Sequence, residues 1–101
     1  MNSTLLKISN AWEMDGFLGL LRDRVFNVQM GEDFLHNLQS IEFDSIDCIP
    51  KDTVKILWYI PIFMEWRDID LKYTLEENEY KKYINLKSKI LNHLEEILGM
   101  P

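Results

Sequence analysis

The last quarter of the chain carries the pattern that most constrains its fold, a long apolar stripe at helical spacing. Apolar side chains recur there every three or four residues, at Tyr80, Tyr83, Leu86, Ile90, Leu94 and Ile97. This period places them on one face of an α-helix. Thr74 followed by Glu77 has the capping-box spacing of a helix start, and Gly99 and Pro101 are stop signals. The sequence therefore predicts a helix over 75–98.

Shorter apolar stripes predict three helices upstream. The first two present these residues on one face: Leu5, Leu6, Ile8 and Trp12 in one, and Phe17, Leu18, Leu21 and Val25 in the other. Asp15 can cap the second of them, whereas Gly19 weakens it by about 1 kcal/mol relative to alanine. A third helix is predicted over 32–40, with Gly31 marking its start.

The segment 50–66 is the most apolar in the chain. Pro50 is a helix start signal, and positions 54–64 leave almost no polar face, which is typical of a helix buried on every side. Pro61 should kink or break such a helix near Leu57. A buried strand is the alternative, since β-branched and aromatic residues are dense here. We favour the helix because a lone strand would have nothing to pair with.

These elements predict an all-α protein, a compact bundle of about five helices with a long C-terminal helix. At 101 residues the chain is expected to form one domain over 1–101. Its lone cysteine, Cys48, permits no internal disulfide and fits a reducing compartment. The longest uncharged stretch, 56–64, is about half of a membrane span, and the N-terminus lacks a signal-peptide pattern. A cytoplasmic, soluble protein is therefore expected.

Residue types that carry chemistry are sparse. His36, His93 and Cys48 are the only nitrogen and sulfur ligands of the usual kinds, and they form no metal-binding motif. Carboxylates near Cys48 disfavour its thiolate, so we expect Cys48 to be a small, half-buried packing residue rather than a nucleophile. No glycine-rich phosphate loop and no acid–base constellation appears. The sequence predicts no catalytic residue, no metal and no cofactor, and hence a protein that is not an enzyme.

The charge pattern favours a protein partner. Seventeen acidic residues against eleven basic ones give a net charge of −6, which disfavours direct nucleic-acid binding and favours association with a basic protein. Two acidic groups flank the apolar segment, and Trp66 is a candidate exposed anchor beside the second. The predicted partner-binding residues are Glu42, Asp44, Asp47, Asp52, Glu65, Trp66, Asp68 and Asp70. A merely solvated surface is the alternative.

Two stretches, Ile49–Trp66 and Gly16–Arg22, resemble small bacterial proteins that are encoded beside toxins. These include the immunity proteins of contact-dependent growth inhibition systems. The helical, acidic immunity proteins of nuclease colicins are also similar in size and charge, and Trp58–Pro61 is a loose echo of their Tyr-Tyr-Pro element. The resemblance implies binding and neutralisation of a cognate toxin, a basic nuclease, by occlusion. The rest of the colicin-immunity pattern is absent, so no binding residues carry over.

A second hypothesis belongs to a different class. An apolar central segment together with a long amphipathic helix can form a self-association interface, which is typical of a helical adaptor or a homodimeric regulatory domain without catalytic activity. An enzyme of unrecognised type is a third reading. The oligomeric state separates the first two hypotheses.

Overall fold

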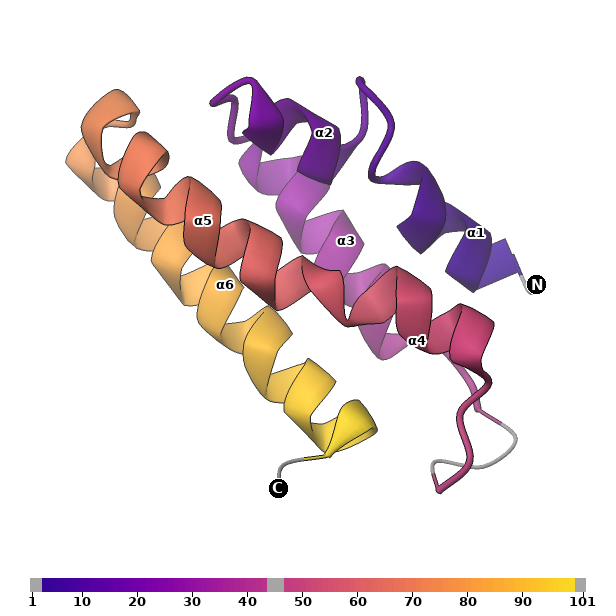
Figure 1. Cartoon of the computed structure of the whole chain (residues 1–101). Helices are drawn as coiled ribbons and strands as arrows, with labels where there is room; N and C mark the ends of the chain where they lie inside the picture. The colour runs from indigo at the N-terminus through magenta and orange to yellow at the C-terminus, as the bar shows by residue number, and fades with distance from the viewer. Residues whose placement is uncertain (1–2, 44–46, 100–101) are drawn as a thin grey trace.

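The computed structural model describes residues 3–43 and 47–99 (Figure 1), which fold into helices joined by short loops. In chain order they are α1 (Ser3–Asn10), α2 (Phe17–Arg22), α3 (Val28–Gln39), α4 (Lys51–Leu57), α5 (Tyr59–Thr74) and α6 (Glu77–Leu98). Only Trp58 separates α4 from α5, and the two run on as one rod in Figure 1. The prediction of an all-α bundle of about five helices with a long C-terminal helix is confirmed.

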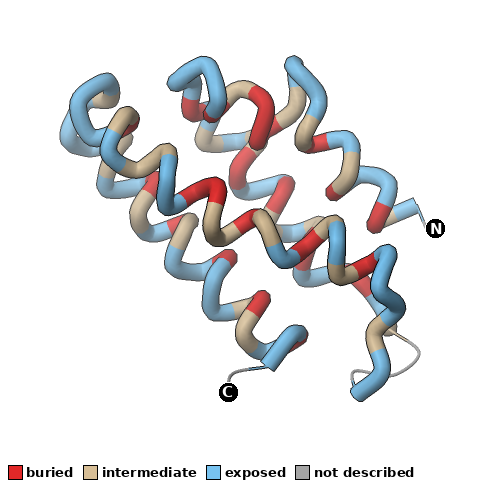
Figure 2. Tube along the Cα trace, in the orientation of Figure 1, coloured by how far each residue is buried: buried red, intermediate tan, exposed pale blue. Residues whose placement is uncertain are grey.

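One hydrophobic core joins side chains from all six helices. The stripe predicted on α6 supplies Tyr83, Leu86, Ile90, Leu94 and Ile97, all of which are buried. α3 and α5 pack against this face of α6, and α1 packs on α3. Figure 2 shows the buried positions turned toward the space between the helices. No helix in the part of the chain described here is long and apolar enough to cross a membrane.

The start of α6 differs from its prediction. Thr74 is the last residue of α5, and its hydroxyl donates a 2.7 Å hydrogen bond to the carbonyl oxygen of Asp70. α6 begins at Glu77 after Glu76, without a side-chain cap. The capping-box prediction was therefore wrong, because the preceding helix already uses Thr74. The predicted end is confirmed at Gly99, which adopts φ 87°.

Two upstream helix starts also differ. Gly16, not Asp15, precedes α2. α3 begins four residues earlier than predicted, where the side chain of Asn27 accepts a hydrogen bond from the backbone N–H of Met30. Gly31 consequently lies inside α3 and is buried. A Cβ at this position would come 2.5 Å from the side chain of Leu86, so only glycine fits without a shift. This glycine serves helix packing rather than helix initiation.

Two residues assigned to apolar faces in the N-terminal third face solvent instead. Leu6 and Val25 are exposed, whereas Leu5, Ile8 and Leu21 enter the core as predicted. Val25 follows the end of α2 at Arg22, so the helical spacing no longer governs where its side chain points. The predicted stripe was one turn too long.

The segment 50–66 is helical, so the strand alternative is excluded for it. α4 ends at Leu57, which confirms the break predicted from Pro61. Proline has no N–H for the carbonyl four residues upstream, and that carbonyl belongs to Leu57. The prediction that this helix is buried on every side was wrong, however. Leu57, Ile60, Phe63 and Met64 are buried, but Trp58 is 49% exposed. α5 then continues to Thr74, beyond the apolar run.

Candidate partner-binding surface

All three tryptophans of the chain lie on one surface around Tyr59. The ring centroid of Tyr59 lies 5.9 Å from that of Trp12, 5.4 Å from that of Trp58 and 5.8 Å from that of Trp66. We call these four residues the aromatic patch. Trp12 comes from the loop after α1, Trp58 from the α4–α5 junction, and the other two from α5. Folding thus gathers aromatic residues that are up to 54 positions apart.

The aromatic patch is open to solvent. Trp66 is 58% exposed, as predicted for a surface anchor, and Trp58 is 49% exposed, which the sequence reading missed because it assigned this residue to the core. Tyr59 is partly buried and contacts both exposed indoles, and the partly buried Trp12 contacts Tyr59. Within the described residues, the hydroxyl of Tyr59 forms no hydrogen bond. Tryptophan and tyrosine in such positions are the residue types that dominate binding energy at protein interfaces.

Two arginines border the aromatic patch through Phe63. This buried ring contacts Trp12 at 5.0 Å between centroids. The guanidinium carbons of Arg22 and Arg67 lie 5.8 Å and 5.6 Å from the centre of the same ring. Arg67 also forms an ion pair with Asp70 at 3.5 Å, which holds it along α5. The surface therefore combines aromatic faces with arginine side chains, a composition that interface cores favour.

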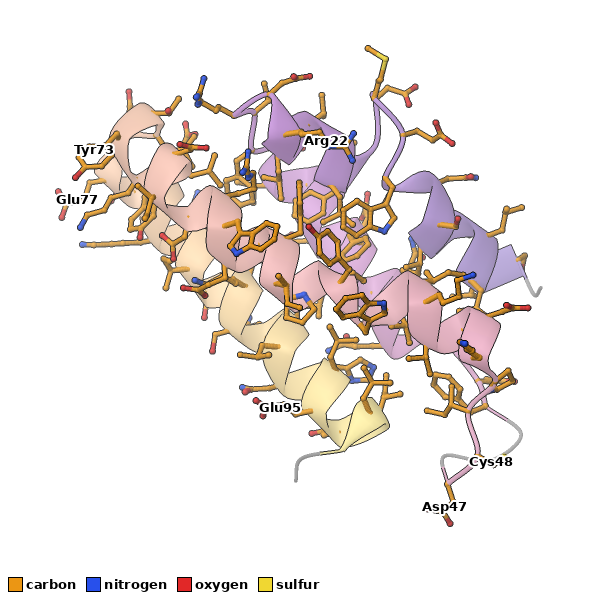
Figure 3. All side chains as sticks on the ribbon, in the orientation of Figure 1. Arg22, Asp47, Cys48, Tyr73, Glu77 and Glu95 are labelled. Atoms are coloured by element: carbon orange, nitrogen blue, oxygen red, sulfur yellow. The ribbon has the colours of Figure 1, made fainter. Side chains whose placement is uncertain are left out.

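The first predicted acidic group lies on and before α4. Glu42, Asp47 and Asp52 are exposed, and Asp44 lies outside the described residues. Figure 3 shows Asp47 at the tip of the loop beside Cys48. Cys48 is exposed rather than half-buried, because this loop turns away from the core. Two lysines of α4 are also exposed, so the acidic excess belongs to the loop and not to the helix.

The second predicted acidic group is largely used by the fold. Asp68 is only 17% exposed and accepts a 2.5 Å ion-paired hydrogen bond from Lys87 of α6, and a hydrogen bond from the hydroxyl of Tyr80. Lys87 also pairs with Glu65 at 2.9 Å. These contacts join α5 to α6. Of this group, Glu65 retains a 70% exposed side chain.

The electrostatics of this junction follow from its contacts. Burial raises the pKa of Asp68, but hydrogen bonds from Lys87 and Tyr80 and attraction to Lys87 outweigh it, so the pKa lies below the ordinary value. Burial likewise opposes the charge of Lys87, while Asp68 and Glu65 raise its pKa overall. Both groups are therefore charged at neutral pH. Asp68 stabilises the α5–α6 contact and leaves the set of carboxylates that a partner can reach.

The two acidic groups are not brought together. Asp52 and Glu65 are thirteen residues apart on the α4–α5 rod, about 20 Å at 1.5 Å per residue. Trp58 and Tyr59 lie between them along this rod, and Trp66 directly follows Glu65. The outer face of α5 continues past Trp66 to Ile69 and Tyr73, which are 68% and 83% exposed. The sequence reading overlooked these two residues, although their spacing from Trp66, three and seven residues, was a usable signal.

Two depressions away from the aromatic patch have volumes of about 190 and 290 Å³, below the roughly 300–1,000 Å³ of typical small-molecule sites. The first is lined by Phe26, Val28, Glu32, Leu35, Lys82, Asn85, Leu86 and Lys89. In residues 3–43 and 47–99, no three His, Cys, Asp or Glu side chains are grouped to hold a metal ion. The aromatic patch is therefore the most developed candidate site.

Comparison of the chain with protein-family models, with curated proteins and with solved structures found no match.

Proposed function

We propose that the chain is an immunity protein that binds and neutralises a cognate toxin domain, a basic nuclease of the contact-dependent growth inhibition type. The observation that carries the proposal is the grouping of all three tryptophans on one open surface around Tyr59. A monomer gains nothing in stability from leaving two indoles half in water, whereas an interface gains its strongest anchors. The resemblance of Ile49–Trp66 to immunity proteins concerns the same segment.

The proposed mechanism is occlusion. The net charge of −6 speeds encounter with a basic nuclease, whose cleft binds nucleic acid. The exposed carboxylates of Glu42, Asp47 and Asp52, on α4 and in the residues before it, pair with basic side chains around the cleft. Trp58 and Trp66 then lose their contact with water against the toxin and slow its release. The immunity protein contributes no chemistry, and it acts in the cytoplasm of the cell that makes it.

Co-expression with the toxin encoded beside this chain tests the proposal. The toxin alone should stop growth, and the wild-type chain should restore it and co-purify with the toxin. Trp58→Ala should weaken the complex by at least about tenfold, since buried tryptophan anchors contribute about 2 kcal/mol or more. Leu91→Ala is the matched control, because Leu91 is 40% exposed on α6, outside the aromatic patch. No complex and no protection with the wild-type chain would refute the proposal.

Charge reversal tests the role of the acidic loop separately. Asp47→Lys combined with Asp52→Lys should slow toxin association, and the effect should shrink as salt is raised, because exposed charges are screened. Glu77→Lys reverses one charge at the other end of the molecule from Asp47 (Figure 3), and should slow association much less. Equal rates for both variants at low salt would show that the loop is only a solvated surface. Asp44→Lys extends the test to the fourth predicted carboxylate.

A further inference from the structure

We propose that a second copy of this chain pairs with it through the outer face of α5, with the two α5 helices antiparallel. The inference does not rest on the proposed toxin binding. It starts from four residues on this face, Ile62, Trp66, Ile69 and Tyr73, which we call the α5 stripe. Their spacing of four, three and four residues is the a/d pattern of helices that pack lengthwise.

The α5 stripe is a continuous apolar surface that the fold leaves open. Trp66, Ile69 and Tyr73 are 58%, 68% and 83% exposed, and Ile62 is partly exposed. α6 lies along the side of α5 that carries Glu65 and Asp68, which both bind its Lys87, and no described helix is drawn in front of α5 in Figures 1 and 2. The α5 stripe runs about 16 Å, or three turns, along a straight helix. Its exposed area is on the order of 500 Å², taking a large side chain as about 200 Å².

The charges beside the α5 stripe favour a second copy of the chain as the partner. In the heptad frame Ile62 and Ile69 take d positions and Trp66 and Tyr73 take a positions. Glu65 and Lys72 then both fall at g, on the same edge, and both are exposed. In an antiparallel pair the g positions of the two helices face each other. Glu65 of one copy therefore lies opposite Lys72 of the other, twice across the two-fold axis.

A parallel arrangement is disfavoured by the same residues. There, g of one helix faces the following e of its partner, so Glu65 would lie opposite Asp70. These two carboxylates repel, whereas Glu65, which keeps a 70% exposed side chain beside Lys87 of its own chain, attracts Lys72 of the other copy in the antiparallel arrangement. In the antiparallel arrangement, Trp66 of one copy packs beside Ile69 of the other, and Ile62 beside Tyr73. The face is thus complementary to itself in one orientation only.

The small exposed area of the α5 stripe predicts a weak dimer. A stable interface of standard size buries about 800 Å² per partner, and the α5 stripe offers less. We therefore expect a dissociation constant in the micromolar range. Trp66 belongs to both the aromatic patch and the α5 stripe, so a bound toxin and a second copy exclude one another at this residue. Self-association then keeps the exposed indole covered when no partner is present.

Sedimentation of the isolated chain over about 1 µM to about 1 mM tests the proposal, since this range brackets a weak interface. The wild-type chain should dimerise with concentration. Glu65→Lys and Lys72→Glu should each raise the dissociation constant by about tenfold, because each converts two attractions into two repulsions. The double variant restores both pairs and should return to within about threefold of wild type. Glu77→Lys and Lys81→Glu are the charge-matched controls on exposed positions of α6.

Glu65→Lys also removes an ion pair with Lys87 and places a second cation beside it, although Lys87 keeps Asp68. Circular dichroism and a urea titration therefore check the folding of each variant. Tyr73→Ala, at an 83% exposed position, is a second test of the interface and should also weaken the dimer. A chain that stays monomeric throughout, or a double variant no better than the single ones, would overturn the proposal. A monomer that still binds toxin removes only this inference, whereas a dimer that binds none removes only the proposed function.

Discussion

The hydroxyl of Tyr83 donates a 2.7 Å hydrogen bond to the main-chain carbonyl oxygen of Met64, and both residues are completely buried. This contact joins the first third of α6 to α5. Burial raises the pKa of the Tyr83 hydroxyl, and the nearby carboxylates of Asp68 and Glu65 add to the effect, so the phenol stays neutral. The two helices are therefore fixed in register by a polar group placed inside the apolar stripe.

Removing this hydroxyl should destabilise the protein without disturbing its shape. Tyr83→Phe keeps the ring against Phe26, at 5.3 Å between centroids, and deletes only the hydrogen bond. We expect a loss of about 1 kcal/mol in the free energy of unfolding, measured with urea. Tyr73→Phe is the control, since Tyr73 is 83% exposed, and should change nothing measurable. Equal stability of the two variants would contradict a structural role for the bond.

Gly19→Ala should destabilise the protein, although helix propensity predicts that it stabilises it. Propensity alone expects a gain of about 1 kcal/mol in a helix interior. In the structure, a Cβ at this position would lie 1.7 Å from the carbonyl oxygen of Glu13, which is backbone and cannot rotate away. We expect a loss of about 2 kcal/mol or more, seen as a lower melting temperature. Gly31→Ala should cost less, because its closest contact is the flexible side chain of Leu86. A stabilised Gly19→Ala variant would disprove the close approach of α2 to the α1–α2 loop.

Acid should weaken the protein through Asp68. The pKa of this carboxyl lies below its ordinary value of 3.8, so the folded state binds its proton more weakly than the unfolded state does. Its contribution to stability is therefore complete above about pH 5, and is lost as the pH falls through 4 and below. Asp68→Asn should lower stability at pH 7 by about 1–3 kcal/mol and flatten the acid limb of the pH profile. Asp33→Asn, at an exposed site on α3, is the comparison. An unchanged acid limb would show that other carboxylates control it.

Alkali should weaken the protein through the same helix pair. The pKa values of Lys87 and Tyr83 are both raised, above 10.5 and 10.0 respectively. A raised pKa stabilises the folded state fully below the unfolded value, and this stabilisation is lost as the pH rises through the folded value. We expect unfolding free energies to be constant near neutrality and to fall above about pH 10. The hydrogen bond to Asp68 raises the pKa of Tyr80 in the same helix pair, so Tyr83→Phe removes one of three titrating groups and should make this fall less steep.

Truncation in the α6 stripe should be costly. Ile90 is completely buried, and Ile90→Ala should lower the free energy of unfolding by about 2–5 kcal/mol. Leu91→Ala, one position along and 40% exposed, should cost well under half as much. The ratio of the two losses, from parallel denaturant titrations, checks the rotational setting of α6. Similar losses would mean that the helix is turned differently against the core.

Periodicity predicted most of the fold because the elements that dominate it are long and amphipathic. α6 spans six turns, and five of the six residues that the spacing selected are buried, whereas Tyr80 is partly exposed. Helix starts were harder, because local capping patterns compete with the neighbouring element. Thr74 ends α5 instead of capping α6, and Asn27 caps α3 ahead of the apolar residues that signalled it. Both outcomes depend on how far the adjacent segment remains helical, which tertiary packing decides.

The candidate site was less predictable, since it is assembled from distant residues. Trp66 could be singled out because charged neighbours bracket it in the sequence. Trp12 and Trp58 could not, because an aromatic residue at helical spacing is usually core, and only the packing of α1 against α4 shows that these reach the surface. Asp68 was counted among accessible carboxylates because nothing in the sequence reveals Lys87, nineteen positions away, as its partner. Charge counts describe a surface, but only folding decides which charges remain on it.

The clustering of the three tryptophans also determines what the intrinsic fluorescence of this protein can measure. Two indoles are about half exposed and all three lie outside the buried core, so fluorescence of the native protein should already be shifted toward that of indole in water. Unfolding therefore has little emission shift left to produce, whereas covering the indoles moves the spectrum toward the blue. The chain thus carries a natural optical probe for occupancy of its surface, and tyrosine absorbance or far-ultraviolet dichroism is the better measure of its folding.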